Sequence, residues 1–253
     1  MAEGSAKDAL VMTNLQKTKE TLRTACPEWL LDVWRPLRRR CWMLLHRSKS
    51  PQSVFSEIYE KKLWLSGESL SGFGSDLDET AVVRKALPVL LKQIGARTMI
   101  DAPCGDFHWM KEVKLELERY IGLDIVPSLI SRNQQQYGDG IREFRAQSIT
   151  QEPLPAVDVI LCRDGLVHLP NSDITKAIRN FKKSGSTYLL TTTFTAPRKN
   201  RDVFTSEWRP LNFETPPWNF PKPLMVIDEK STKSRGRYRD KVLALWRLSD
   251  LSV

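Results

Sequence analysis

The sequence predicts an α/β protein with a doubly wound, mostly parallel sheet, preceded by a helical extension at the N-terminus. Short apolar runs alternate with amphipathic helical patterns from residue 97 onward, which is typical of βαβ units. Several runs are apolar throughout, as expected for strands covered by helices on both faces. The chain has 253 residues, of which 41% are hydrophobic and 27% charged, which suits one such domain with additional elements.

The expected elements follow one another in regular order. The pattern predicts strands at 97–102, 119–125, 142–149, 157–164, 186–194 and 240–248, of which 157–164 is strongly apolar. Periodic patterns predict helices at 54–64, 105–118, 127–138 and 171–185, the last with Asn or Ser as its cap. Ser75 and Asp78 have the spacing of a capping box for a further helix, which Gly95 ends. The residues before it, 67–75, are rich in Gly and Ser and predict a loop.

The chain divides into an extension with a linker, residues 1–53, and a main domain, residues 54–253. Within the extension, residues 29–47 mix Trp and Leu with an Arg cluster, and Pro36 favours two short helices over one. Such a segment could lie on an anionic membrane surface. The alternative is a helix pair that packs its aromatic face on the domain.

The formal net charge of +9 is concentrated in the two flanks. Residues 1–50 hold ten Lys or Arg against five Asp or Glu, and residues 197–247 hold twelve against six, so the middle is nearly neutral. A basic flank can meet nucleic acid, anionic lipid or a phosphorylated substrate, or it can be a solvated surface.

Cellular location and metal content are bounded by simple patterns. No apolar run approaches the roughly 18–20 residues that span a bilayer, and the N-terminus has no apolar signal region. A cytoplasmic protein is expected, peripheral at the inner face of the membrane if residues 29–47 bind lipid. The four cysteines, Cys26, Cys41, Cys104 and Cys162, form no CxxC pair and have no His at zinc-ligand spacing, so no metal site is expected.

Polar residues at the ends of the first two strands predict a ligand site. In a doubly wound sheet, ligands bind beyond the carboxyl ends of the strands, where the strand order reverses. Asp101 ends the first strand and Gly105 follows it; Asp124 ends the second strand, 23 residues after Asp101. An acid at about this distance accepts hydrogen bonds from ribose hydroxyls. A loop with one glycine does not offer a pyrophosphate the close backbone approach it needs, so a nucleoside without phosphates is favoured.

Four segments then resemble motifs of class I S-adenosylmethionine-dependent methyltransferases. TMIDAPCGDFHWM (98–110) resembles motif I, although the third Gly of the usual motif is absent, and YIGLDI (120–125) resembles the second motif. DVILCRDGLVHLP (158–170) and TYLLTTTF (187–194) resemble the motifs of the fourth and fifth strands. The resemblance spans residues 54–248 and implies a Rossmann-like methyltransferase fold with S-adenosylmethionine as cofactor. The cofactor-binding residues that it implies are Asp101, Ala102, Pro103, Gly105, Asp106, Asp124, Ile125, Ser148, Ile149 and Arg163, with Ser148 where many relatives have an Asp.

Two further segments resemble bacterial methyltransferases associated with surface-polysaccharide and glycolipid biosynthesis. These are SGFGS (71–75) and WRPLNFETPPWNFPKPL (208–224), taken with the motifs above. The resemblance implies O-methylation of a sugar or glycan hydroxyl. Residues 71–75 would fold over the cofactor, and residues 208–224 would help to build the acceptor pocket or pack across the end of the sheet.

An alcohol acceptor needs a general base, and His168 is the candidate. Methyl transfer from a sulfonium depends largely on positioning, but a hydroxyl must also lose its proton. His168 follows Asp164 by four residues, so a helical turn there would place both on one face. We expect His168 as base with Asp164 as its orienting partner. The alternative is that Asp164 caps the turn and His168 packs beneath the loop.

Other functions remain open at this point. The acceptor could be RNA, a protein or a small molecule, although an exocyclic-amine motif is missing where CRDG stands. A nicotinamide-dependent oxidoreductase is less favoured because the glycine loop has one Gly and no Tyr-x-x-x-Lys pair occurs. A non-catalytic module of the same fold is less favoured because Asp101, Gly105 and Asp124 are all present. The sequence does not indicate an oligomeric state.

Overall fold

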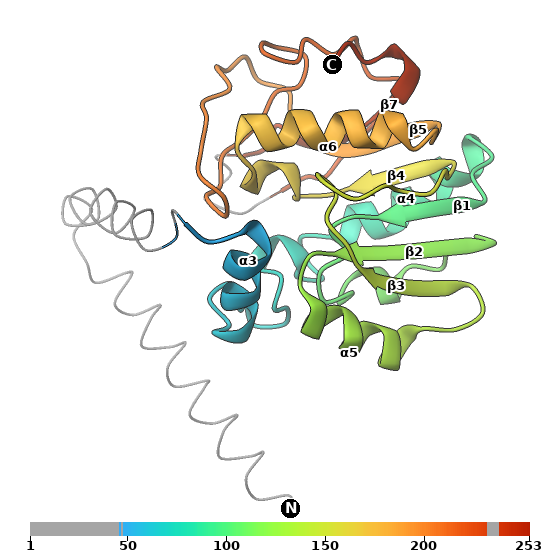
Figure 1. Cartoon of the computed structure of the whole chain (residues 1–253). Helices are drawn as coiled ribbons and strands as arrows, with labels where there is room; N and C mark the ends of the chain where they lie inside the picture. The colour runs from blue at the N-terminus through green and yellow to red at the C-terminus, as the bar shows by residue number, and fades with distance from the viewer. Residues whose placement is uncertain (1–45, 47, 232–237) are drawn as a thin grey trace, which may run out of the picture. The chain divides into compact units, whose positions relative to one another are not determined.

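A seven-stranded sheet forms the centre of the described part of the chain, residues 46, 48–231 and 238–253, in the computed structural model (Figure 1). The sheet and its helices belong to the unit Ser50–Val253. Residues 29–45, Cys26 and Cys41 lie outside the described residues, so the membrane contact of the extension stays a prediction.

The elements of this unit alternate as the sequence predicts. The helices are α3 Pro51–Glu60, α4 Ala81–Gln93, α5 Pro127–Tyr137 and α6 Asn171–Lys183. The strands are β1 Thr98–Asp101, β2 Arg119–Asp124, β3 Arg142–Ala146, β4 Val159–Cys162, β5 Tyr188–Phe194, β6 Met225–Asp228 and β7 Lys241–Arg247. Short 3₁₀ turns occupy Phe73–Ser75, Met110–Glu112, Leu166–His168 and Leu248–Asp250.

The strand order of the sheet is β3-β2-β1-β4-β5-β7-β6. The first five strands in this order are parallel, whereas β7 runs antiparallel to both β5 and β6. The order reverses between β1 and β4, which is the position where doubly wound sheets bind ligands. The predicted fold class, a doubly wound and mostly parallel sheet, is confirmed.

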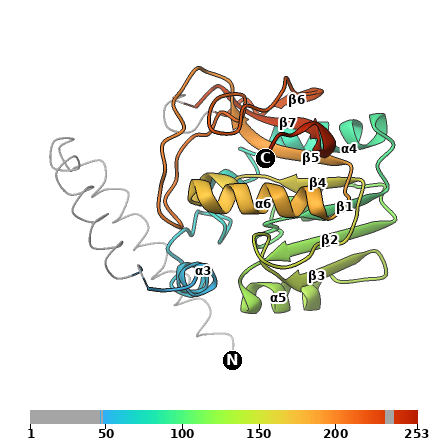
Figure 2. The same cartoon turned by 45° about the horizontal axis from the view of Figure 1, so that its top comes forward.

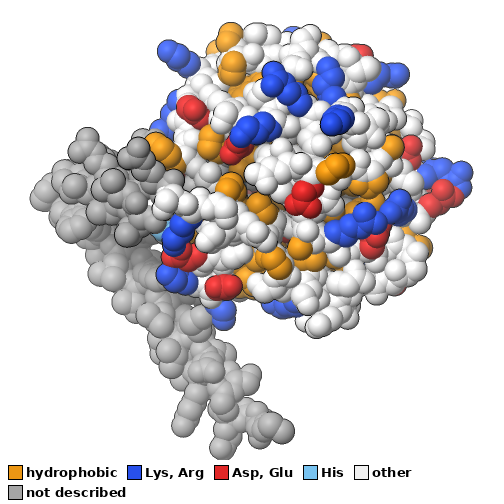
Figure 3. Space-filling view, viewed as in Figure 1, with side chains coloured by type: hydrophobic (Ala, Val, Ile, Leu, Met, Phe, Trp, Pro, Cys, Tyr) orange, Lys and Arg blue, Asp and Glu red, His pale blue; other side chains and the backbone are white. Residues whose placement is uncertain are grey.

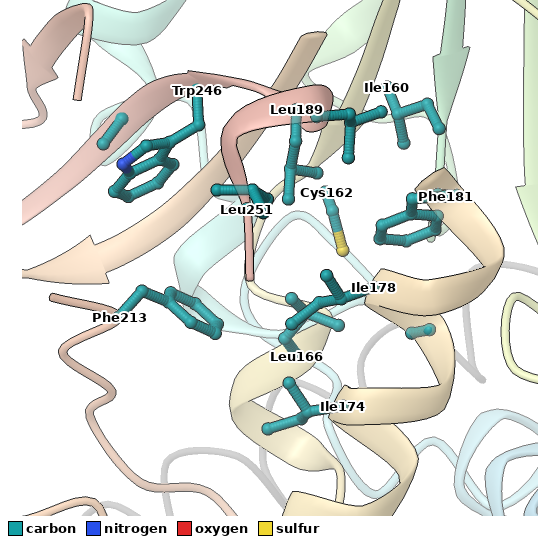
Figure 4. Close-up of a cluster of buried hydrophobic side chains, with 14 of the residues drawn as sticks. Ile160, Cys162, Leu166, Ile174, Ile178, Phe181, Leu189, Phe213, Trp246 and Leu251 are labelled. Atoms are coloured by element: carbon teal, nitrogen blue, oxygen red, sulfur yellow. The ribbon is translucent and has the colours of Figure 1, made fainter. Parts of the chain in front are cut away.

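Helices cover both faces of the sheet, with α6 on one face and α4 on the other (Figures 1 and 2). Side chains that alternate along a strand therefore enter two separate apolar layers. In β4, Ile160 and Cys162 pack in the layer of α6, and Val159 and Leu161 pack in the layer of α4. Figure 4 shows the first layer, in which Phe181 of α6 points toward the strands. This is why β4 is apolar at every position.

Several local predictions were wrong. The predicted helix at 105–118 is a series of turns with the single 3₁₀ turn Met110–Glu112. The capping box does not form, because α4 begins at Ala81 after Thr80, and α6 is preceded by Pro170 without a side-chain cap. Residues 51–53 belong to α3, whose N-cap Ser50 accepts a hydrogen bond from the backbone N–H of Ser53, rather than to a linker.

The Pro-aromatic segment 208–224 is ordered and contributes to the core. Phe213, Trp218 and Phe220 are at most 4% exposed, and Phe213 and Phe220 stack with ring centroids 5.1 Å apart. Trp246 of β7 packs against the same rings. The expectation that this segment packs across the sheet is met, and these ring faces are not available to a sugar.

The surface of the unit carries no segregated charge on the face seen in Figure 3, where basic, acidic and apolar side chains are interspersed. Among the described residues, no helix is long and apolar enough to cross a membrane. Cys104 and Cys162 are buried free thiols.

Candidate active site

The carboxyl ends of β1, β2 and β4 bring the predicted site residues to one edge of the sheet. Asp101 ends β1, Asp124 ends β2, and Arg163 follows β4. The loops after β1 and β4 approach closely, since a Cβ at Gly165 would lie 2.3 Å from Cδ of Pro103. Only glycine allows this contact, which fixes the two loops side by side.

Asp124 is tied to the glycine turn that follows β1. Its Oδ2 accepts a hydrogen bond from the backbone N–H of Gly105 (3.3 Å), and its Oδ1 accepts one from that of Val126 (3.1 Å). Burial raises the pKa of Asp124 to about 6, although backbone N–H donors oppose the rise. At pH 7 and above the carboxylate is ionised and can accept further hydrogen bonds from two hydroxyls.

Asp101 lies deeper than Asp124. Its side chain accepts a hydrogen bond from the hydroxyl of Tyr120 at 2.6 Å, and the residue is 3% exposed. Burial raises the pKa of Asp101 to about 7, although the Tyr120 hydrogen bond and Arg163 act to lower it. Asp101 therefore carries a proton over part of the neutral pH range.

Residues 66–76, here called the strap, cross over the glycine turn. Asp106 accepts hydrogen bonds from the hydroxyls of Ser69 and Ser71 and from the backbone N–H of Leu70, at 2.7–3.0 Å. Gly105 has a φ of +54°, and a Cβ there would lie 2.3 Å from the hydroxyl oxygen of Ser71. Asp106 was predicted to bind the cofactor, and in the structure its carboxylate accepts hydrogen bonds from the strap.

The other end of the strap is held by Arg163. One guanidinium nitrogen donates to the carbonyl of Gly74 at 2.8 Å, and another donates to Glu229 at 2.6 Å. The same guanidinium lies over the ring of Trp109, 5.4 Å from its centroid. Arg163 was predicted to bind the cofactor, and the structure gives it these protein partners.

Asp164 has a left-handed backbone conformation, with a φ of +54°, at the end of β4. Its backbone N–H donates to the hydroxyl of Thr192, and its Oδ2 accepts from the ammonium of Lys241 at 2.6 Å. Burial acts to raise the pKa of Asp164, but Lys241 and Arg163 lower it to about 2. Asp164 is ionised throughout the physiological range and is not itself a base.

His168 ends the 3₁₀ turn that follows Asp164. Its ring packs on Trp64, with centroids 4.5 Å apart, and its buried Nδ1 has no hydrogen-bond partner among the described residues. Burial lowers the pKa of His168 to about 4, although the Asp164 carboxylate opposes this. The imidazole is therefore neutral at pH 7. Among the described residues, no hydrogen bond joins His168 to Asp164, whose nearest cation is Lys241.

The remaining predicted residues line the loops after β1, β2 and β3. Ala102 is buried and donates its N–H to Leu161, Pro103 follows in a cis peptide, and Ile125 is half-buried. Ser148 is 8% exposed and its hydroxyl lies 3.0 Å from that of Thr150. Ile149 is half-buried against the layer of α6.

Several partners of the predicted residues come from distant parts of the chain and were not predicted. Trp64, Glu229 and Lys241 contact predicted residues but lie in none of the motifs that pointed to the site. Tyr120, which contacts Asp101, opens the motif YIGLDI. Lys241 is the second residue of the strand predicted at 240–248 and the first of β7, and its place beside β5 is the signal that could have found it.

Comparisons with known proteins give structural similarity at low sequence identity. No family model matches the sequence, and no curated protein sequence matches it. The chain is similar in structure to a magnesium protoporphyrin IX methyltransferase from Synechocystis with bound SAH, at 14% identity and a TM-score of 0.45, over 62% of this chain and 84% of that one. It is also similar to the N-methyltransferase NodS from Bradyrhizobium japonicum, at 15% identity and a TM-score of 0.45, over 68% of this chain and 98% of that one. A sugar N-methyltransferase from Streptoalloteichus has 16% identity and a TM-score of 0.42, over 53% of this chain and 55% of that one.

Proposed function

We propose that this protein is an S-adenosylmethionine-dependent methyltransferase. The strand order of its sheet and the antiparallel direction of β7 are those of the Rossmann-like methyltransferase fold. The observation that carries the proposal is the pairing of Asp124, at the end of β2, with the backbone N–H of Gly105 after β1. This arrangement leaves an ionisable acid for a ribose diol beside a turn that has no side chain at Gly105.

The residues present fit the cofactor. Asp124 and Gly105 would hold the ribose, and Ile125, Ser148 and Ile149 would border the adenine. S-Adenosylmethionine, when bound, would supply a methyl group attached to a sulfonium sulfur. This sulfur is a leaving group that needs no further activation. The protein then needs only to orient the acceptor, exclude water and accept a proton.

Calorimetric titration of S-adenosylmethionine into the purified protein tests the cofactor. We expect Asp124→Ala to weaken binding by about 10- to 100-fold, because a hydrogen bond to a charged group is worth about 1.5–3 kcal/mol. Binding to the unaltered protein should be constant above pH 7 and weaken as the pH falls through about 6, where Asp124 becomes protonated. Asp78→Ala removes an exposed acid outside the site and is the matched control.

Two results would contradict the cofactor proposal. One is tighter binding of NADH than of S-adenosylmethionine in a parallel titration. The other is equal affinity of the Asp124→Ala and Asp78→Ala proteins for S-adenosylmethionine, which would mean that Asp124 does not contact the cofactor.

For the acceptor, we propose a sugar or glycan hydroxyl, with His168 as the base. A neutral imidazole with an unpartnered Nδ1 can take the proton of a hydroxyl as the methyl group is transferred. Trp64, packed on His168, supplies an aromatic surface that the buried rings of Phe213 and Phe220 do not. Transfer of radiolabelled methyl groups to neutral sugars, RNA and protein, compared side by side, tests this choice. Labelling of RNA or protein alone would exclude the sugar acceptor.

A further inference from the structure

A buried group of four charged side chains lies beside the candidate base. Asp164 and Glu229 carry the negative charges of this group, and Arg163 and Lys241 carry the positive charges. Lys241 lies 2.6 Å from Asp164 and 3.2 Å from Glu229, and Arg163 lies 2.6 Å from Glu229 and 3.5 Å from Asp164. Three of the side chains are at most 10% exposed, and that of Asp164 is 25% exposed. The group contains two positive and two negative charges, so it is formally neutral.

Lys241 reaches this group from the last strand of the sheet. Residue 241 pairs with Phe194 at the carboxyl end of β5, because β7 is antiparallel to β5. Its ammonium thereby enters the same strand edge as Asp164, which it contacts across 77 residues of sequence. Replacing a buried ion pair with apolar side chains is often neutral or stabilising, so stability alone does not account for this one.

We propose that Lys241 is a positioning residue of the transfer site: it holds the carboxylate of Asp164 and so prevents Asp164 from pairing with the imidazole of His168. The inference rests on the proposed role of His168. Asp164 is four residues from His168 and acts on it electrostatically, yet its hydrogen bond goes to Lys241. The imidazole is thereby left with an Nδ1 that has no hydrogen-bond partner among the described residues and can accept a proton from an acceptor hydroxyl.

The other charges near His168 do not take over this role. Arg209, from the loop after β5, acts to lower the pKa of His168, but its guanidinium donates to the carbonyls of Leu166 and Val167. Trp64, on the strap side, carries no charge. Glu229 faces Lys241 and Arg163. Burial is the largest influence on the pKa of His168, and Asp164 is the acid that opposes it.

The test is an NMR titration of the imidazole of His168, which requires neither cofactor nor acceptor. The His168 signal is assigned by its loss in His168→Gln. Lys241→Met removes the ammonium while keeping the chain length, and we expect the pKa of His168 to rise by at least about one unit, because the freed carboxylate then stabilises the imidazolium. Lys241→Arg should restore the original titration. Lys230→Met, which removes an exposed ammonium paired with Asp228, should leave it unchanged.

A second comparison separates the effect through Asp164 from a direct effect of the ammonium on His168. In an Asp164→Asn background, Lys241→Met should raise the pKa of His168 less than it does alone. An equal rise in both backgrounds, or no rise in Lys241→Met, would overturn the proposal. If Lys241→Met does not fold, Lys241→Leu, which also removes the ammonium and offers Asp164 no hydrogen-bond donor, carries the same comparison. Failure of the cofactor titration would leave these results standing and would remove only the proposed reaction.

Discussion

Replacing His168 with alanine is expected to lower the rate of methyl transfer by about 10²- to 10⁴-fold, the usual contribution of a general base. The buried Nδ1 of His168 has no hydrogen-bond partner in the part of the chain that the structure describes, so the loss should come from proton transfer. Affinity for S-adenosylmethionine should be unchanged, because His168 follows β4 whereas Asp124 and Gly105 lie at β2 and β1. The measurement is single-turnover transfer to the best acceptor, with calorimetry in parallel.

The pH dependence of that rate has a defined sign. The pKa of His168 is lowered to about 4, so the neutral, proton-accepting form persists from alkaline pH down to about 4 and is lost below it. The acidic limb should therefore lie well below 6.5. His46→Ala is the control. Full activity in His168→Ala, or a loss of cofactor affinity equal to the loss of rate, would exclude His168 as base.

The second large effect concerns stability. Asp101→Asn should stabilise the protein without cofactor at pH 8, because burial raises the pKa of Asp101 from 3.8 to about 7. At about 1.36 kcal/mol per unit, this shift corresponds to an upper limit of about 4 kcal/mol. Asparagine retains an oxygen that can accept the hydrogen bond of Tyr120.

The sign follows from proton linkage. Below pH 3.8, Asp101 is protonated in both the folded and unfolded chains, and its favourable contribution is complete. As the pH rises to about 7, the unfolded chain ionises first and this contribution is lost. The difference between Asp101→Asn and the unaltered protein should thus be small at pH 4 and largest above pH 7, in urea unfolding. A constant difference, or destabilisation at pH 8, would contradict it.

The sheet could be predicted from sequence because its central strands are rich in apolar residues. In β4, for example, alternate side chains enter two apolar layers. Four consecutive apolar residues therefore indicate that this strand is buried on both faces. β6 was missed because it is a short edge strand in which Val226 is 49% exposed. The helix expected at 105–118 does not form, since Gly105 and, two residues later, Phe107 both have a left-handed backbone conformation, with φ of +54° and +57°.

The candidate site was predictable where its parts are local. Asp124 and Gly105 were found because strand ends in a doubly wound sheet converge on one edge. The partners of Asp106, Arg163 and Asp164 were not found, because hydrogen bonds between residues 35 to 89 positions apart depend on the tertiary fold. The sequence correctly places these three polar side chains at the carboxyl edge of the sheet. What each one does there depends on the residues to which it is hydrogen-bonded.

The late position of β7 has a consequence for synthesis on the ribosome. β5 pairs with β4 on one side and with β7 on the other, so residues 188–194 present an open strand edge until residue 241 has emerged. Translation of the intervening residues takes roughly 2 to 10 seconds at about 5–20 residues per second. Open apolar edges favour pairing with other chains. The nascent protein therefore passes through an interval in which chaperone protection of β5 matters. This interval ends when β7 pairs with β5, and the same strand brings Lys241 to the buried charged group.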